Sequence, residues 1–364
     1  MRLTKPTLLT DKEKCLQNIR KMTDKAKKHN LSFRPHFKTH QSADIGRWFI
    51  PRGIDKITVS SVDMAFYFAR DGWKDITIAF PLNINEIDRI NLLAREHTIH
   101  LTLLNMHGIE ALNEGLKYEA GIFLEIDTGS KRTGISYENI GEIFQLKEKI
   151  DASPKLRLEG MLTHSGHTYQ AGSREEIMGI HQETKDRLSW IKKQMAQQND
   201  TLHISVGDTP SCTLADDFSN IDEIRPGNFV FYDLQQYNLN ICTLDEIAVC
   251  MACPVVAKYK ERNEIVVHGG AVHFSKDSFP EENRSIYGYG VILTDKGWII
   301  PEEKIILKKL SQEHGTLYAD SSMLKKFDIG DFIGILPVHS CLTADAMGSY
   351  REVATGRSYD HMKK

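Results

Sequence analysis

The sequence lacks the features of an exported, membrane-spanning or nucleic-acid-binding protein. Residues 1–11 have no apolar core of the signal-peptide type, and no run approaches the roughly 18 apolar residues that a membrane span requires. Neither sign of charge is in excess, because 46 Lys and Arg stand against 49 Asp and Glu. This balance gives no preference for polyanions. We therefore expect a cytoplasmic protein whose partner is neither nucleic acid nor a membrane.

Cysteine is scarce as well. The six cysteines are scattered over 364 residues, which argues against a disulfide framework. Cys250 and Cys253 have the spacing of a redox or half-zinc motif, but they lie in an apolar run with no second pair nearby. We expect most of these thiols to be buried.

The chain falls into two parts with different hydrophobic patterns. Up to about residue 240, apolar runs alternate with segments of helical period, including a helix predicted over 173–198 with Ser173 and Glu176 as its capping box. This alternation predicts a parallel (β/α)8 barrel over residues 11–240, with its chemistry at the carboxyl ends of the strands. An open, doubly wound sheet is the alternative. The predicted strands are 32–34, 57–59, 76–80, 99–104, 122–126, 156–162, 202–206 and 229–231.

After residue 240 the helical periodicity fades, and β-type runs joined by turns take over. They predict an antiparallel β domain over residues 241–364, against which we expect residues 1–10 to pack. The runs are 245–259, 264–268, 291–300 and 332–338.

One lysine follows the first predicted strand in an unusual setting, the segment Arg34-Pro35-His36-Phe37-Lys38-Thr39-His40. A partly desolvated amine beside cationic groups has a lowered pKa and becomes a nucleophile toward aldehydes, which is the route to a Schiff base. A solvated basic loop is the alternative interpretation of this segment.

Two glycine-containing loops near the end of the predicted barrel are candidates for phosphate binding. Gly207-Asp208-Thr209-Pro210-Ser211 follows a predicted strand, so its backbone N–H groups and hydroxyls could cradle a phosphate. Arg225-Pro226-Gly227-Asn228 precedes the predicted strand 229–231 and offers a second approach. Loops at the last two strands are a recurrent phosphate site in barrels.

These segments resemble the D-serine dehydratase and D-threonine aldolase family, which has the alanine-racemase-like fold of pyridoxal phosphate enzymes. The matching motifs occur in order along nearly the whole chain: Arg34-Pro35-His36-x-Lys38-Thr39-His40, Asp127-Thr128-Gly129-x-x-Arg132-x-Gly134, His164-x-Gly166-His167-x-Tyr169, Gly207 to Ser211, and Arg225-Pro226-Gly227-Asn228. The resemblance also implies a homodimer.

The resemblance assigns roles to individual residues. It implies that Lys38 forms the internal aldimine with pyridoxal phosphate, that Arg132 approaches the cofactor ring, and that Tyr169 lies beside ring and substrate. His167 is a further catalytic candidate. The other expected cofactor-binding residues are His36, His164 and, at the phosphate, Gly207, Thr209, Gly227 and Asn228.

A second informative pair lies near the C-terminus. His339 and Cys341 are two residues apart, so on one strand they would point to the same face, and their imidazole and thiol suit zinc. A buried histidine beside an inert cysteine is the alternative. The pair falls where similar D-serine dehydratases place a zinc-binding His-x-Cys, whereas aldolases more often have a carboxylate in the second position.

The resemblance therefore favours a zinc-assisted, pyridoxal phosphate-dependent lyase that eliminates water and ammonia from a D-β-hydroxy amino acid to give a 2-oxo acid. Retro-aldol cleavage, with His164, His167 or His273 as base, uses the same parts. A racemase would need a second acid/base, for which Tyr287 and Tyr289 are candidates. The alternative outside catalysis is a protein of pyridoxal phosphate homeostasis, but such carriers lack a second domain.

One segment departs from the family pattern. Similar members have Asp-Ala-Gly before a Ser-x-Asp stretch, whereas this chain has His268-Gly269-Gly270, followed by His273 and then Ser275-Lys276-Asp277. The two extra imidazoles could supply a ligand, recognise a substrate carboxylate or cap a turn. Gln41, where a basic residue is common, is a milder change. The identity of the D-amino acid is thus left open.

Overall fold

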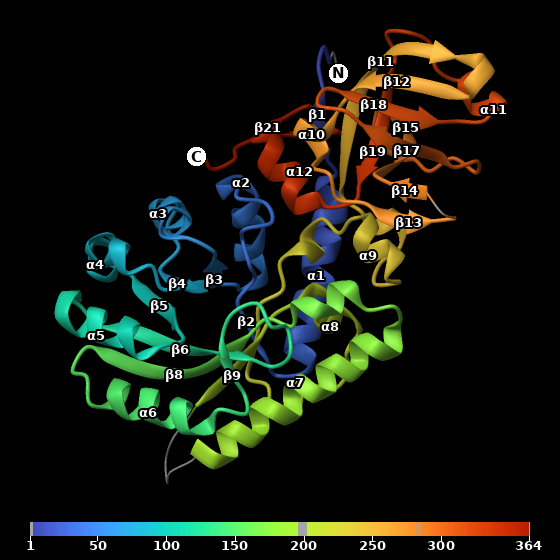
Figure 1. Cartoon of the computed structure of the whole chain (residues 1–364). Helices are drawn as coiled ribbons and strands as arrows, with labels where there is room; N and C mark the ends of the chain where they lie inside the picture. Colours follow the sequence, from blue (N-terminus) through green and yellow to red (C-terminus); the bar gives the residue numbers. More distant parts are fainter. Residues whose placement is uncertain (1–2, 196–201, 283, 364) are drawn as a thin grey trace. The chain divides into compact units, whose positions relative to one another are not determined.

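The computed structural model describes residues 3–195, 202–282 and 284–363 (Figure 1). Its contacts divide the chain into two compact units. The barrel unit comprises Lys21–Lys38 and Arg47–Gly227, and the β unit comprises Met1–Arg20, Thr39–Gly46 and Asn228–Lys364.

Eight parallel strands form the centre of the barrel unit, in the order β2-β10-β9-β8-β6-β5-β4-β3. The segment after β2 closes the ring at the remaining edge: His36 forms a parallel bridge with Thr58 of β3, and the amide of Phe37 donates to the Thr58 carbonyl at 2.9 Å. The predicted barrel is confirmed, and the open sheet is excluded. The strands are β2 (Ser32–Phe33), β3 (Lys56–Val59), β4 (Asp75–Pro81), β5 (Thr98–Leu103), β6 (Ala120–Asp127), β8 (Leu156–Thr163), β9 (His203–Val206) and β10 (Glu223–Ile224).

Helices cover the outside of these strands (Figure 1). The longest, α7, begins where predicted, but only half of the predicted capping box forms. The amide of Glu176 donates to the Ser173 hydroxyl at 3.2 Å, whereas the Glu176 carboxylate accepts from the amide of Gly172, at 2.7 Å, and not from that of Ser173. The end of the predicted helix, residues 196–198, lies outside the described residues. The helices are α3 (Val62–Arg70), α4 (Ile87–Ala94), α5 (Met106–Gly115), α6 (Ile140–Asp151) and α7 (Arg174–Met195).

The predicted eighth strand at residues 229–231 is wrong. The eighth strand is β10 at Glu223–Ile224, and Asn228–Val230 forms a 3-10 turn. The apolar run of residues 229–231 misled the prediction, because the real strand is only two residues long and carries a buried carboxylate. As a consequence, the segment that begins at Arg225 follows the last strand and lies at its carboxyl end.

A buried polar network fills part of the barrel interior. The Glu223 carboxylate accepts from Arg34 Nε at 2.9 Å and from the Ser205 hydroxyl at 2.6 Å. Arg34 also forms an ion pair with Asp75, and Arg225 donates to the Ser205 hydroxyl. Burial raises the pKa of Glu223, but the charges of Arg34 and Arg225 and the hydrogen bonds from Ser205 and Arg34 together lower it by more, so the net shift is downward. Glu223 is therefore the buried anion that balances two guanidinium groups.

Replacing Glu223 with glutamine should destabilise the protein by about 3–5 kcal/mol, because it leaves buried cations without their counter-charge. Urea unfolding of the apoprotein, followed by tryptophan fluorescence, measures the change. The exposed Glu96, which pairs with Arg95 at the surface of the same unit, is the matched control. Equal unfolding midpoints for Glu223→Gln and Glu96→Gln would contradict this role.

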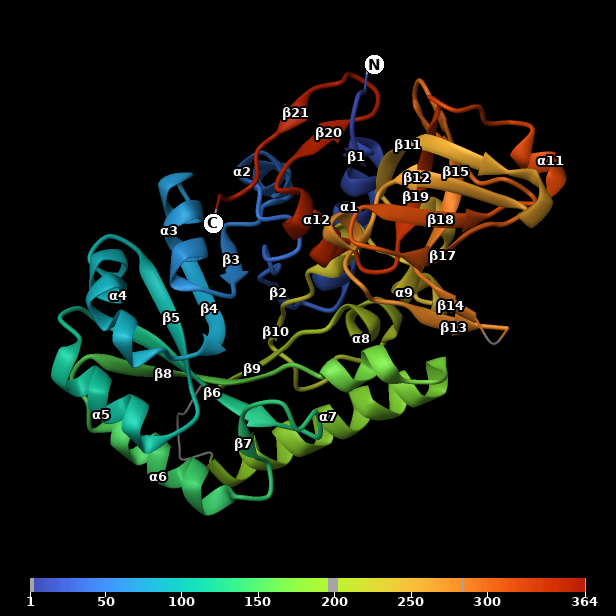
Figure 2. The ribbon, with the colours of Figure 1, turned by 45° about the horizontal axis from the view of Figure 1, so that its top comes forward.

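The β unit contains a closed ring of six antiparallel strands, β11-β12-β18-β17-β15-β19, whose members are grouped in Figure 2. β11 closes the ring because its two halves pair with different strands. Residues 251–254 pair with β19 and residues 255–259 pair with β12, and a bulge lies between Val255 and Ala257. β1 (Thr7–Thr10) adds to β11 on the other side and pairs in parallel with β20 (Tyr350–Glu352). The ring strands are β11 (Val249–Tyr259), β12 (Glu264–His268), β15 (Gly288–Thr294), β17 (Ile305–Leu310), β18 (His314–Tyr318) and β19 (Phe332–Pro337).

Five of the six cysteines are buried, and Cys341 is half-buried. Cys250 and Cys253 lie in β11 with no exposed surface, and burial raises the pKa of both thiols. Thiols in this state are poor nucleophiles. Within the described ranges, no helix combines the length and the apolar character needed to cross a membrane.

Candidate active site

Lys38 lies at the carboxyl end of β2, where the backbone is held from both sides. The amide of His36 donates to the Pro226 carbonyl at 3.0 Å, and the fully buried Phe37 packs against Phe68 and Trp73 with ring centroids 4.9 and 5.1 Å away. The next residue, Lys38, is exposed. A buried aromatic ring thus anchors the segment, and its neighbour presents an amine at the active end of the barrel.

Two neutral imidazoles lie in the electrostatic field of this amine. Burial lowers the pKa of His36 well below its ordinary value, and the charges of Lys38 and Arg225 lower it further. Burial and then Lys38 lower the pKa of His164 to about 3, although its Nδ1 is hydrogen-bonded to the Gly207 carbonyl. Both side chains are therefore uncharged at neutral pH, and the fixed positive charge of the cluster comes from lysine and arginine.

Arg132 reaches the same cluster from the loop after β6. Its positive charge lowers the pKa of both His36 and His164. Arg132 and His164 also line one small cleft, together with Asp127, Thr163 and other residues. Asp127 shapes the loop, because its carboxylate accepts from the amides of Gly129 and Lys131. The structure thus brings together four of the predicted residues: His36, Lys38, Arg132 and His164.

The loop after β9 is built around Asp208, which caps the short helix α8 (Thr209–Leu214). Its buried carboxylate accepts from the Ser211 amide at 2.7 Å and from the Thr168 hydroxyl at 3.1 Å. Burial raises the pKa of Asp208 to about 6 against these hydrogen bonds. The Tyr169 hydroxyl accepts from the Thr209 amide at 3.2 Å. Tyr169 and Thr209, which belong to two different sequence motifs, are therefore neighbours.

Two hydroxyls of this loop are buried without a hydrogen-bond partner among the described residues, those of Thr209 and Ser211. Buried polar atoms are usually satisfied, and the Thr209 hydroxyl in particular is available to a bound group. Gly207 lies against the other predicted phosphate loop: a Cβ added there would come within 3.1 Å of the Arg225 Cβ and 3.2 Å of its carbonyl oxygen. The two predicted loops thus lie side by side.

His167 has different neighbours from the Lys38 cluster. Burial lowers its pKa, Asp127 opposes this shift, and Arg187 of α7 adds to it. Its Nδ1 is buried without a partner among the described residues. Its predicted catalytic role stays a prediction.

Arg225 was not among the predicted site residues. Its buried guanidinium donates to the Thr163 carbonyl at 2.8 Å, and its charge acts on His36 and His164. Burial lowers the pKa of Arg225 to about 10 despite the neighbouring Glu223. The available signal was its place two residues before Gly227, in the predicted phosphate loop, but the wrong strand at 229–231 put that loop before the last strand rather than after it.

In the β unit, His339 and Cys341 do interact, but not on a strand as predicted. β19 ends at Pro337, His339 occupies the N-cap position, and Cys341 lies in the first turn of α12 (Ser340–Met347). Burial opposes the charge on His339, but the Cys341 thiol, Asp233 and Asp277 raise its pKa to about 10. Burial raises the pKa of Cys341, but the hydrogen bond and charge of His339 together with the hydrogen bond to Thr39 lower it by more. Without a metal, the pair therefore favours a thiolate beside a protonated imidazolium.

Polar neighbours within the β unit orient this pair. His339 Nδ1 is 2.6 Å from Asp277 Oδ2, the carboxylate–histidine arrangement that directs the other ring nitrogen toward a metal. Cys341 Sγ lies 3.4 Å from the Thr39 hydroxyl and 3.6 Å from the Asn228 amide nitrogen. Asp277 was overlooked as a site residue, although it belongs to the Ser-x-Asp segment.

Asn228 was predicted at the phosphate. Its side-chain amide instead donates to Asp233 at 2.6 Å and to the Ser340 hydroxyl at 3.1 Å. Asn228 therefore supports the turn that carries Cys341, and a phosphate contact stays a prediction for its backbone.

Comparison with known proteins places the fold and the motifs in one family. The model of the alanine racemase N-terminal domain matches residues 10–235. The chain belongs to this family. The family model described as "Putative serine dehydratase domain" matches residues 248–353, so the predicted membership of the D-serine dehydratase and D-threonine aldolase group is confirmed.

Several members of the alanine-racemase-like family are similar over nearly the whole chain. A D-serine dehydratase from Dictyostelium discoideum is 28% identical, and the match covers 96% of this chain and 93% of the relative. A D-threo-3-hydroxyaspartate dehydratase from Delftia sp. is 25% identical, and the match covers 98% of this chain and 96% of the relative. A 3-hydroxy-D-aspartate aldolase from Paracoccus denitrificans is 24% identical, with coverage of 97% and 89%.

Solved structures agree with this assignment at the level of the fold. The Delftia dehydratase has a TM-score of 0.89 at 22% identity and covers 100% of this chain and 98% of its own. A cysteine-to-alanine variant of a D-threo-3-hydroxyaspartate dehydratase, in a metal-free form, has a TM-score of 0.90 at 22% identity and covers 100% of this chain and 98% of its own.

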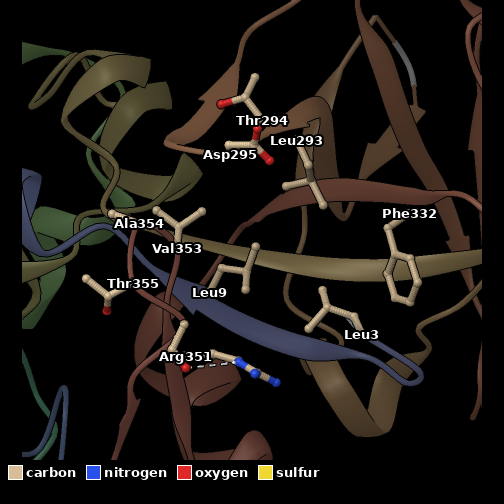
Figure 3. A pocket seen from close by; sticks show the side chains of 11 residues that line it. Leu3, Leu9, Leu293, Thr294, Asp295, Phe332, Arg351, Val353, Ala354 and Thr355 are labelled. Carbon is tan, nitrogen blue, oxygen red and sulfur yellow. Dashed lines mark hydrogen bonds between the residues drawn. The ribbon is translucent and has the colours of Figure 1, made fainter. Parts of the chain in front are cut away.

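A separate pocket of about 550 Å³ lies within the β unit of this family member (Figure 3). Leu9 and Phe332 contribute apolar surface, and Asp295 and Arg351 contribute charge. The volume suits a small molecule. The pocket contains none of the predicted site residues, so it is not the candidate active site.

Proposed function

We propose that this protein is a pyridoxal phosphate-dependent lyase that converts a D-β-hydroxy amino acid to a 2-oxo acid and ammonia, with a zinc-class metal at His339 and Cys341. The observation that favours a dehydratase over an aldolase is the pairing of His339 with Cys341. The dehydration reaction is also supported by the two similar dehydratases that match nearly their whole length. The metal site is supported by the metal-free form of a D-threo-3-hydroxyaspartate dehydratase in which a cysteine is replaced by alanine. A homodimer and a cytoplasmic location stay predictions.

The residues at the carboxyl ends of the barrel strands fit pyridoxal phosphate. The unpartnered hydroxyls of Thr209 and Ser211 suit a phosphate, and the exposed Lys38 suits an aldehyde. Arg132 and Arg225 supply positive charge to the same cluster. When bound, the cofactor supplies the electron sink for the bond that is broken at Cα.

Asp208 should act as a positioning residue for the phosphate. Replacing Asp208 with alanine frees the Ser211 amide and the Thr168 hydroxyl and should weaken cofactor binding about 10–100-fold, whereas asparagine, also a good N-cap, should retain most of the affinity. Absorbance titration of the apoprotein with pyridoxal phosphate measures this. If alanine and asparagine bind the cofactor equally well, Asp208 does not position the loop.

The chain's own groups account for the remaining steps. Lys38 would hold the cofactor through its amine, and the same amine, when free, would remove the Cα proton as general base. Hydroxide is a poor leaving group, and a metal held by His339 and Cys341 would supply the Lewis acid that stabilises charge on the β-hydroxyl oxygen. Overall, the D-β-hydroxy amino acid would lose water and then take up water to give the 2-oxo acid and ammonia.

Aldol cleavage is the second candidate, because an aldolase of the family is also similar over most of its length. It requires a base for the β-hydroxyl proton. Burial lowers the pKa of His164 to about 3, so this imidazole is uncharged but a weak base, which disfavours it for that task. Racemisation has weaker support. The Tyr289 hydroxyl donates to Glu281 at 2.9 Å, and burial together with this carboxylate raises the Tyr289 pKa.

The proposal is tested by incubating the full chain, loaded with pyridoxal phosphate and zinc, with D-serine or L-serine. We expect 2-oxo acid and ammonia in equal amounts from the D-isomer alone, loss of this activity with a chelator, and recovery when zinc is restored. Turnover of the L-isomer at the same rate, or activity that survives complete metal removal, would contradict the assignment.

A further inference from the structure

A second group of potential metal ligands lies in the β unit, at the segment that departs from the family pattern. His268 ends β12, His273 lies in the short helix α10 (Ala271–Phe274), and Glu313 lies in the turn between β17 and β18. Their ligand atoms all lie within 4.8 Å of one another. None of these residues has a part in the proposed reaction, so the inference below is independent of it.

Backbone contacts hold the two loops together. The amide of Gly269 donates to the Glu313 carbonyl at 2.9 Å, and the amides of Ala271 and Val272 donate to the carbonyls of Ser311 and Gln312. A Cβ at Gly270 would come within 2.2 Å of the Gln312 carbonyl oxygen. The glycine is therefore required for the close approach that brings the imidazoles to the carboxylate.

The distances suit one ion. Glu313 Oε2 is 3.5 Å from His268 Nε2 and 4.0 Å from His273 Nε2. Ligands about 2.1 Å from a tetrahedral zinc are about 3.4 Å apart, so small side-chain rotations would complete the site. The side chains of His268 and Glu313 are 43% and 48% exposed, which leaves the fourth position open to water.

Other roles account for the group less well. A substrate carboxylate would be repelled by Glu313, which faces both imidazoles. Turn capping explains only His273, whose Nδ1 accepts from the Gly270 amide at 3.1 Å. We propose that His268, His273 and Glu313 bind a divalent transition-metal ion of the zinc class. Two imidazoles and one carboxylate favour a zinc-class ion, because magnesium and calcium bind mainly oxygen ligands.

Metal binding changes the tautomer of one ligand. With Nδ1 as acceptor, the neutral ring of His273 carries its proton on Nε2. Coordination through Nε2 moves this proton to Nδ1 and breaks the hydrogen bond from Gly270. Nitrogen-15 spectra of labelled histidines should therefore show His273 changing tautomer as zinc is added.

The test is a zinc titration of the metal-stripped full chain by calorimetry, in the Cys341→Ala background that removes the thiol of the other candidate site. His268→Gln and Glu313→Gln should each weaken zinc binding at least about tenfold. His314→Gln is the matched control, because the exposed His314 pairs with His268 in the sheet but lies outside the ligand group.

We expect the His314→Gln protein to bind one zinc ion as tightly as its Cys341→Ala parent. The proposal is overturned if the His268 and Glu313 variants also match that parent, or if the parent binds no zinc while His273 keeps one tautomer. Because the site is independent of catalysis, neither result depends on whether the dehydratase assignment holds.

Discussion

Replacing Lys38 with alanine should abolish the visible absorbance of the bound cofactor and reduce turnover by at least about 10³-fold, since the same amine binds the cofactor and removes the Cα proton. Lys38 is exposed at the end of β2, next to the buried anchor Phe37, so the substitution should leave the fold intact. Absorbance spectra and steady-state rates measure the effect.

Lys131 provides the matched control for this variant, because it is an exposed lysine in the barrel unit whose backbone amide, not its amine, contacts Asp127. Lys131→Ala should keep the absorbance band and the activity. A Lys38→Ala protein with an unchanged spectrum would remove the basis for the cofactor assignment.

Replacing Cys341 with alanine should separate metal chemistry from cofactor chemistry. We expect the zinc content to fall by one ion per chain, the ion proposed at His339 and Cys341, and kcat to fall about 10²–10³-fold, because stabilisation of the leaving hydroxide contributes several kcal/mol to the barrier. The cofactor absorbance should be unchanged, since the Lys38 cluster is built from barrel residues. Metal analysis, spectra and rates on one preparation give all three quantities.

Cys242 is the control for the thiol itself, because it is buried in the same unit and burial raises its pKa. Cys242→Ala should retain both metal and activity. The metal role of Cys341 would have to be abandoned if wild type and Cys341→Ala carried the same sub-stoichiometric metal, or if the variant kept full activity.

The alternation of apolar runs with segments of helical period was enough to predict the barrel, and the polar motifs at its strand ends were enough to predict the neighbourhood of Lys38. A parallel strand places its last residues at a common edge, so His36, His164 and Arg132 had to lie near one another once the fold was known. The position of the Gly207 loop at a strand end was predictable from the same pattern, and Asp208 caps the short helix that follows. Phosphate binding by this loop stays a prediction.

Features that depend on contacts between distant segments could not be read from the sequence. Asp277 orients His339 across 62 positions of the chain, and no local pattern reports that contact. Nothing in the sequence indicated that the side-chain amide of Asn228 donates to Ser340, which is 112 positions away. β10 was missed because a two-residue strand with a buried glutamate carries no apolar signal.

The central question for this family member is whether it dehydrates its substrate or cleaves it by a retro-aldol reaction, because both proposed reactions use Lys38 and the proposed metal site. The most direct measurement is the amount of 2-oxo acid and of aldehyde released by the zinc-loaded holoenzyme from D-serine, D-threonine and D-threo-3-hydroxyaspartate, each followed in parallel by NMR. We predict 2-oxo acid with an equal amount of ammonia and no aldehyde. Aldehyde and glycine without 2-oxo acid would contradict the dehydratase assignment.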